Sequence, residues 1–82
     1  MQLQVKQVLQ NIEHALRSAG ANLANVVRIN VLTTDADLYI QEGVPQVINF
    51  LDKTRPTSTI FQVSRLVHPD WMVEIEAIAI ID

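Results

Sequence analysis

Two carboxylates lie within an otherwise apolar segment near the end of the chain. Glu74 and Glu76 alternate with Val73, Ile75 and Ala77, which is the spacing of a β-strand. Successive strand side chains point to opposite faces, so both glutamates share one face and the apolar residues share the other. An ionised carboxylate buried without a partner is unstable, so the glutamate face must meet water, a polar cavity or another subunit.

The other residues that could do chemistry are scattered. His14 falls on the polar side of the first predicted helix, and His68 lies in a predicted turn beside Pro69 and Asp70. Two isolated histidines do not make a metal site, so none is predicted. The spacing offers neither a glycine-rich phosphate loop nor a Ser/His/Asp set. Trp71 is expected either at a subunit boundary, where aromatic residues are enriched, or as a cap on the turn.

Charge and hydropathy exclude two classes of partner. The net charge is -3, and the six basic residues are spread along the chain, whereas nucleic-acid binders usually gather positive charge on one face. No uncharged stretch approaches the length of a membrane span, and the N-terminus lacks the pattern of a signal peptide. We therefore expect no nucleic-acid or membrane partner, and a location in the cytoplasm or in an organelle matrix after processing.

The length of the chain favours self-association. Residues 1–82 are predicted to form a single domain, and a domain of this size buries only roughly 60–65% of the surface that its unfolded chain exposes. There is no cysteine for a disulfide and no Cys/His cluster for structural zinc, while 49% of the residues are apolar. Oligomerisation is the remaining means of stabilising so small a core.

The hydrophobic pattern predicts two helical regions. Apolar residues recur at helical spacing from residue 3 to residue 19, and Gly20 follows in the position of a left-handed C-cap. Residues 35–53 are also helical in tendency, and Thr34 or Asp35 can cap their start. Gly43 and Pro45 predict a break in this second region, with the proline in the first turn of a new helix.

Three segments alternate as strands do. Residues 26–33 place Val27, Ile29 and Val31 on one face, and residues 58–66 and 72–81 are expected to form an antiparallel hairpin. The predicted fold class is α+β, of order α-β-α-β-β, with two helices packed on one face of a mainly antiparallel sheet. The second face of the sheet is left uncovered, which favours assembly. It is expected to carry Arg28, Asn30, Gln62, Glu74, Glu76, Ile78 and Ile80.

Four stretches of the sequence match one known family in the same order. They are residues 15–21 (ALRSAGA), residues 26–35 ending in Thr34-Asp35, Arg55-Pro56, and residues 73–79 (VEIEAIA), of which the last is the most specific. With these stretches the chain resembles, over essentially its whole length, the RidA family, whose members are also called YjgF or L-PSP proteins. The resemblance implies a chorismate-mutase-like fold, usually a homotrimer whose sheets line an inner barrel, with small-molecule sites in clefts between subunits.

The resemblance also implies a chemistry. The best understood members hydrolyse reactive 2-imino or enamino acids to 2-keto acids and ammonia, without a metal or another cofactor. In them an arginine binds the substrate carboxylate, and the first glutamate of the final motif positions the attacking water. That glutamate corresponds to Glu74, which is the predicted catalytic residue. The predicted substrate-binding residues are Ser58, Thr59 and Ile60.

The chain departs from the family pattern at three places. Ser58 stands where the family has its carboxylate-binding arginine, and a serine hydroxyl brings no charge; Arg55 lies before Pro56 and differs in direction. Gly43 aligns roughly with an asparagine that many members carry. The family's N-terminal strands have no counterpart before Met1, and a longer native chain would explain a sequence that opens directly on a helix.

Three functions stay open at this point. The first is imine deamination through Glu74. The second is a non-catalytic module of the same fold that binds small metabolites or assembles, in which Glu74 forms a charged pair, for example with Arg28, and Ser58 is a plain strand residue. The third is endoribonuclease activity, which relatives have been assigned, although the acidic balance disfavours it.

Overall fold

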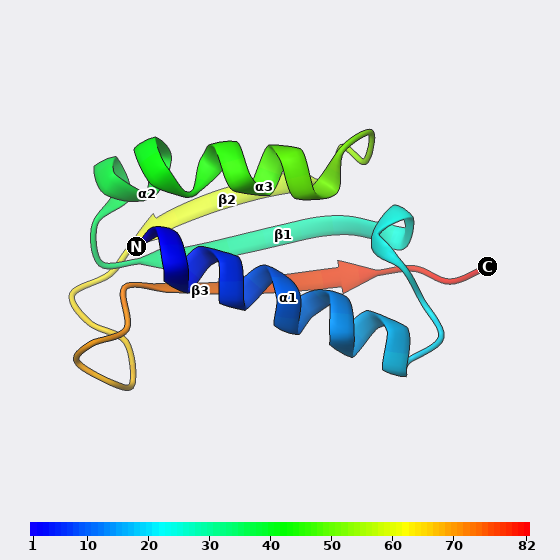
Figure 1. The fold of residues 1–82 in the computed structure, drawn as a ribbon, viewed down its shortest axis with the longest axis horizontal. Helices are drawn as coiled ribbons and strands as arrows, with labels where there is room; N and C mark the ends of the chain where they lie inside the picture. The colour runs from blue at the N-terminus through cyan, green and yellow to red at the C-terminus, as the bar shows by residue number, and fades with distance from the viewer.

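Three helices lie on one face of a three-stranded sheet, and the other face is open (Figure 1). The computed structural model describes all 82 residues. No helix has the combination of length and apolar character needed to cross a membrane. The elements in chain order are α1 (Gln2–Ser18), the short 3₁₀ turn η1 (Leu23–Asn25), β1 (Val26–Thr33), α2 (Ala36–Glu42), α3 (Val44–Leu51), β2 (Thr57–Gln62) and β3 (Val73–Ala79).

β1 lies in the middle of the sheet, and this corrects the predicted hairpin. The strand order is β2-β1-β3, with β1 parallel to β2 and antiparallel to β3, so the last two strands do not touch and the sheet is mixed. The helical crossover through α2 and α3 returns the chain parallel to β1, as such connections do. The loop at residues 63–72 then carries the chain to the opposite edge of the sheet. The α+β class and the one-sided helix layer are confirmed.

The core lies between the helices and the middle of the sheet. Val31 and Thr33 of β1 are fully buried, as is Val5 of α1, and Val73 and Ile75 of β3 face the same layer. The buried Thr33 hydroxyl has a hydrogen-bond partner, because it donates to the Met72 carbonyl at 2.8 Å. The prediction that the apolar residues of β3 face the helices is therefore confirmed.

The predicted helix boundaries are also confirmed. Gly20 follows α1 with φ +80°, and the Asp35 side chain caps α2 by accepting from the Leu38 backbone N–H at 3.0 Å. The second helical region breaks at Gly43, and Pro45 lies in the first turn of α3. A glycine is needed at position 43 because the Tyr39 ring packs directly against its backbone and leaves no room for a side chain.

Two side chains lie on a different face from the one expected. Val27 is exposed because the pairing of β1 with β3 shifts between Val26 and Arg28, and this bulge puts Val26 in the core instead. Gln62 pairs in register with Thr33, which places it on the helix-covered side. There its Oε1 accepts from the Ala36 backbone N–H at 2.9 Å, at the start of α2.

We predict that Gly43→Ala destabilises the fold. A Cβ at this position would lie 2.6 Å from the Tyr39 Cδ1 and 2.9 Å from the Tyr39 carbonyl oxygen, and Tyr39 is too buried to move freely. We expect a loss of about 1–3 kcal/mol in the free energy of unfolding, measured by urea denaturation, with a changed near-ultraviolet signal from Tyr39. Gly20→Ala is the control. An added Cβ at Gly20 meets open space, so this variant strains only the local backbone, which has a positive φ, and leaves the Tyr39 signal unchanged. A Gly43→Ala variant as stable as the parent would contradict the packing.

Tyr39 offers a second test of the core. Burial raises the pKa of Tyr39 to about 12. An unfolded chain releases this proton near pH 10, so the stabilising effect is complete below about pH 10 and is lost as the pH rises through about 12. Because the chain has one tyrosine, absorbance at 295 nm reports it alone. We expect a midpoint near 12 in the native protein and near 10 in urea; a native midpoint of 10 with the fold intact would place Tyr39 outside the core.

Candidate functional site

The open face of the sheet is built from three rows of side chains that run across the strands. Each row contains one residue from each of the three strands. Neighbouring residues in register point to the same side of a sheet, so the pairing defines the rows. The outer row nearest the α2 end of the sheet holds Phe61, Leu32 and Glu74; the middle row holds Thr59, Asn30 and Glu76; the third holds Thr57, Arg28 and Ile78.

Both glutamates are exposed on this face, as the sequence pattern predicts. Glu74 lies across from Leu32 and Glu76 across from Asn30. Neither carboxylate has an ion-pair partner within the chain. Arg28 in particular pairs in register with Ile78, two residues beyond Glu76 and four beyond Glu74. The alternative in which Arg28 neutralises Glu74 is therefore not realised inside one chain.

The three predicted substrate-binding residues do not share a face. Thr59 lies on the open face beside Asn30, whereas Ser58 and Ile60 pair with Ile29 and Val31 and so point to the helix side of β2. Because β1 separates β2 from β3, strand geometry sets the Cα atoms of Ser58 and Glu74 roughly 14 Å apart. A single chain thus does not bring Ser58 and Glu74 into one site, although all three β2 residues are exposed at the sheet edge.

Asn30 is the polar residue at the centre of the open face, and one of its atoms is unpaired. Its side-chain Oδ1 is buried but accepts no hydrogen bond. A buried acceptor without a donor costs about 1–3 kcal/mol, so such atoms usually find a partner in the native assembly. The sequence pattern placed Asn30 on this face correctly, but an unpaired atom is visible only once the neighbours on β2 and β3 are known.

Gln4 is a positioning residue that the sequence pattern does not reveal. From the first turn of α1 its Nε2 donates to the Asp70 carbonyl, and its Oε1 accepts from the Met72 N–H, both at 2.8 Å. The Met72 carbonyl in turn accepts from the Thr34 backbone N–H. This tether holds the start of β3 and hence Glu74, two residues further on. In sequence Gln4 is one of several glutamines on an amphipathic helix.

The loop before β3 carries the remaining candidates. His68 and Trp71 pack with ring centroids 5.6 Å apart, and the His68 Nδ1 accepts from the Asp70 N–H at 3.1 Å. Trp71 therefore caps the loop within this chain, and about half of its surface stays exposed. No cluster of three metal-ligating side chains forms anywhere in the chain.

Comparison with known proteins identifies the family. The family model described as Endoribonuclease L-PSP matches residues 1–81. The chain belongs to this family. A RutC family protein from Pyrococcus horikoshii is 33% identical over 76 residues, which cover 93% of this chain and 59% of that protein.

Solved structures of the L-PSP family have the same fold. A member of the YjgF/YER057c/UK114 family from Mycobacterium tuberculosis superposes with a TM-score of 0.88 at 36% identity, covering 94% of this chain and 64% of that one. RidA from the Antarctic bacterium Psychrobacter sp. PAMC 21119 gives 0.87 at 31% identity, covering 94% and 61%. The resemblance to RidA, YjgF and L-PSP proteins is confirmed, and the chain spans about 60% of the length of these relatives.

We predict that Gln4→Ala loosens the start of β3. Loss of the Oε1 acceptor leaves the Met72 N–H unpaired, so we expect its amide hydrogen to exchange about five- to tenfold faster, as the loss of one hydrogen bond of about 1 kcal/mol implies. Gln7→Ala is a matched control, since Gln7 bonds only to Asn11 of the same helix. Unchanged exchange at Met72 in Gln4→Ala would show that the tether is dispensable.

Proposed function

We propose that this protein hydrolyses reactive 2-imino or enamino acids to 2-keto acids and ammonia, with Glu74 as the catalytic carboxylate. The observation that carries the proposal is the state of Glu74: it occupies its position in the family motif, it lies on the open face, and no cation in its own chain pairs with it. A carboxylate that is not neutralised by an internal partner is free to accept a proton from water.

The reaction needs three proton transfers, and one carboxylate serves all of them. Water adds to the carbon of the protonated imine while Glu74 takes a proton from the water, which gives a tetrahedral carbinolamine with a neutral amino group. The protonated Glu74 then gives this proton to the nitrogen. As the C–N bond breaks and ammonia leaves, Glu74 takes the hydroxyl proton so that the carbonyl forms, and that proton leaves with the ammonia as ammonium. Leu32 and Phe61, which share a row with Glu74, supply an apolar surface beside the reacting atoms.

A second copy of the chain is part of the proposal. The face that carries Glu74 also exposes Phe61, Ile78 and Ile80, and the buried Asn30 Oδ1 lacks a donor. A neighbouring protomer would cover these apolar groups and supply that donor. It would also bring Ser58 of one chain towards Glu74 of another, whereas strand geometry keeps these two residues roughly 14 Å apart within one chain. A homotrimer, as the resemblance implies, would form such clefts three times.

Ser58 supports a second candidate, a non-catalytic module that binds small metabolites between its copies. A serine hydroxyl gives a substrate carboxylate one neutral hydrogen bond, where an arginine gives a bidentate, charge-assisted pair. Weak carboxylate binding would leave the fold and the cleft intact while slowing turnover. RNA cleavage gains no such support, because the open face presents two carboxylates and one arginine to a phosphate backbone.

A coupled assay separates these candidates. The purified protein is mixed with an amino acid and a deaminase that releases 2-iminopropanoate, and pyruvate formation is compared with buffer. We expect acceleration that Glu74→Gln lowers at least about a hundredfold, as loss of an acid–base group does. Glu76→Gln is the matched control on the same face and keeps the activity.

Ser58→Arg distinguishes the two readings of the cleft. If the rest of the site is catalytic, the added guanidinium raises the rate at low substrate about tenfold, through one charge-assisted carboxylate contact. No acceleration by the parent protein, together with a gain in Ser58→Arg, would leave the binding module as the function. Activity that is equal in the parent and in Glu74→Gln would refute the role of Glu74.

A further inference from the structure

The outer edge of β3 has no partner strand. β3 lies at one end of the strand order, so its backbone pairs with β1 on one side only. The Thr34 N–H donates to the Met72 carbonyl, and with the register this bond shows that the even-numbered residues of β3 turn their backbone groups towards β1. The odd-numbered residues turn theirs outwards. Free backbone N–H and C=O groups therefore line this edge at Val73, Ile75, Ala77 and Ala79.

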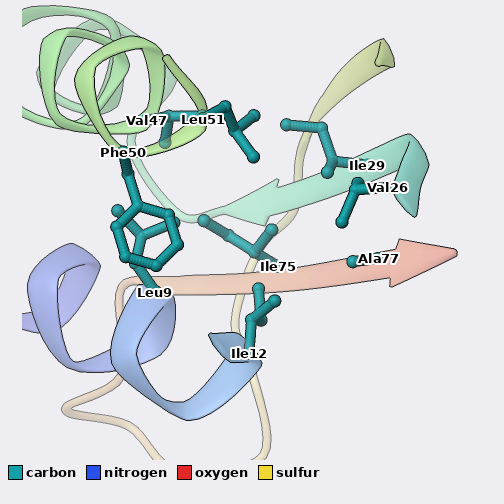
Figure 2. Close-up of a pocket in the computed structure, with 9 residues that line it drawn as sticks. All are labelled: Leu9, Ile12, Val26, Ile29, Val47, Phe50, Leu51, Ile75 and Ala77. Atoms are coloured by element: carbon teal, nitrogen blue, oxygen red, sulfur yellow. The ribbon is translucent and has the colours of Figure 1, made fainter. Parts of the chain in front are cut away.

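A groove of about 780 Å³ runs along the same edge. One wall is the start of β3 with the loop before it, and the other wall is α1, which contributes Val8, Ile12 and Ala15. Ile12 and Ile75 line both this groove and the small apolar cavity drawn in Figure 2, so the groove continues the core outwards. Its volume falls in the range of about 300–1,000 Å³ that is typical of binding sites.

α1 covers the space next to β3. Figure 1 shows this helix running obliquely over the strand, so that its C-terminal half lies beyond the edge of the sheet. Neighbouring strands lie about 4.8 Å apart, so a strand that paired with β3 would lie beneath this half of α1. It would bond to the free backbone groups and cover the apolar residues of α1. The edge and the groove together thus fit an extended strand.

A second copy of the chain fits this edge poorly. Antiparallel pairing of two β3 strands would bring two α1 helices over strands only about 4.8 Å apart, whereas the axes of packed helices lie about 8–10 Å apart. The same pairing would place the glutamates of both chains along one seam of the open face, where like charges destabilise a sheet. The occupant is therefore a strand that has no helix layer of its own.

The charges at this edge define the chemistry of such a strand. Its side chains would alternate between α1 and the open face. Those towards α1 would meet the apolar wall of the groove, which favours valine or isoleucine. Those on the open face would stand beside Glu74 and Glu76, which have no ion-pair partner within the chain, and this favours lysine or arginine. Asp70 adds a further carboxylate at the groove.

From these features we propose that the β3 edge and the groove under α1 bind an extended segment of another protein, in which apolar and basic residues alternate. The segment adds a fourth strand to the sheet, so main-chain hydrogen bonds supply affinity and the alternation supplies specificity. A length of seven residues would match β3. The site uses Glu74 and Glu76 only as charges, and binding is the readout, so a failure here leaves the proposed deaminase activity untouched.

Synthetic peptides test the proposal with the unmodified protein. A peptide of alternating valine and lysine, as long as β3, is titrated against ¹⁵N-labelled protein beside a valine–glutamate peptide of equal length. We expect saturable binding of the first and at least tenfold weaker binding of the second. At saturation the amide hydrogens of the odd-numbered residues of β3 should exchange at least tenfold more slowly, while those of the even-numbered residues, already bonded to β1, change little.

Three results would overturn the proposal. The first is the absence of saturable binding of the valine–lysine peptide up to about 1 mM. The second is binding without slower exchange at the odd-numbered amides, because charge alone would then hold the peptide. The third is slow exchange at these amides before peptide is added, together with a doubled mass in sedimentation, which would show that a second copy occupies the edge.

Ala77→Pro tests the backbone contact. The Ala77 N–H points away from β1, so proline removes a free donor and no bond of the sheet, which is the position that proline tolerates on edge strands. In a variant whose thermal midpoint shows that it is folded, we expect affinity for the valine–lysine peptide to fall about tenfold. Unchanged affinity in the folded variant would place the peptide elsewhere.

A pair of helix variants tests the groove without touching the sheet. Ala15→Arg puts a bulky cation into the groove at an exposed position, and it should lower the affinity at least fivefold. Ala19→Arg, the same change just after α1 and outside the groove, is the matched control and should keep the parent affinity. Equal affinities in the two variants would refute the groove as the binding site.

Discussion

The double pairing of β1 is the constraint on which the rest of the structure depends. β1 is the one strand with hydrogen-bonded neighbours on both sides, so its register decides which side chains of β2 and β3 share a face. Its helix-side residues Val31 and Thr33 are fully buried, which leaves no freedom to shift by one residue. The open face is consequently determined by the packing of the opposite one, and Glu74 is presented there because Ile75 is needed in the core.

Patterns that are local in sequence could be predicted, and those that depend on a neighbouring strand could not. The strict alternation of β3 predicts both of its faces, and Gly43 with Pro45 predicts the helix break, because each signal lies within a few residues. The order of strands in a sheet carries no such local signal, and the predicted antiparallel hairpin of β2 and β3 was wrong. The sheet face of Val27 was predicted wrongly because it depends on a β-bulge in the pairing of β1 with β3, which the alternation within β1 does not show. The face of Gln62 was predicted wrongly because it depends on the register in which β2 pairs with β1.

The candidate site shows the same division. Resemblance to a family predicts Glu74 from its motif, and the structure places it on the open face. Which β2 residues accompany it depends on strand order, and Ser58 and Ile60 turn out to point away from Thr59. Gln4 and the unpaired Asn30 oxygen become recognisable only from contacts made across many residues of chain. Our proposal that a second copy completes the site therefore rests on what a single chain leaves apart, namely Ser58 and Glu74.

The position of β1 also has a consequence for biosynthesis. Thr33 faces Val73 in the sheet, so the central strand leaves the ribosome some forty residues before its antiparallel partner. During that interval one edge of an apolar strand has no hydrogen-bond partner and is open to pairing with other chains. Every pair between β1 and β3 joins residues forty or more positions apart in the chain, and such long-range pairing slows the search for the native state. Until β3 has been made, the free edge of β1 is therefore the part of the sheet most open to pairing with other chains.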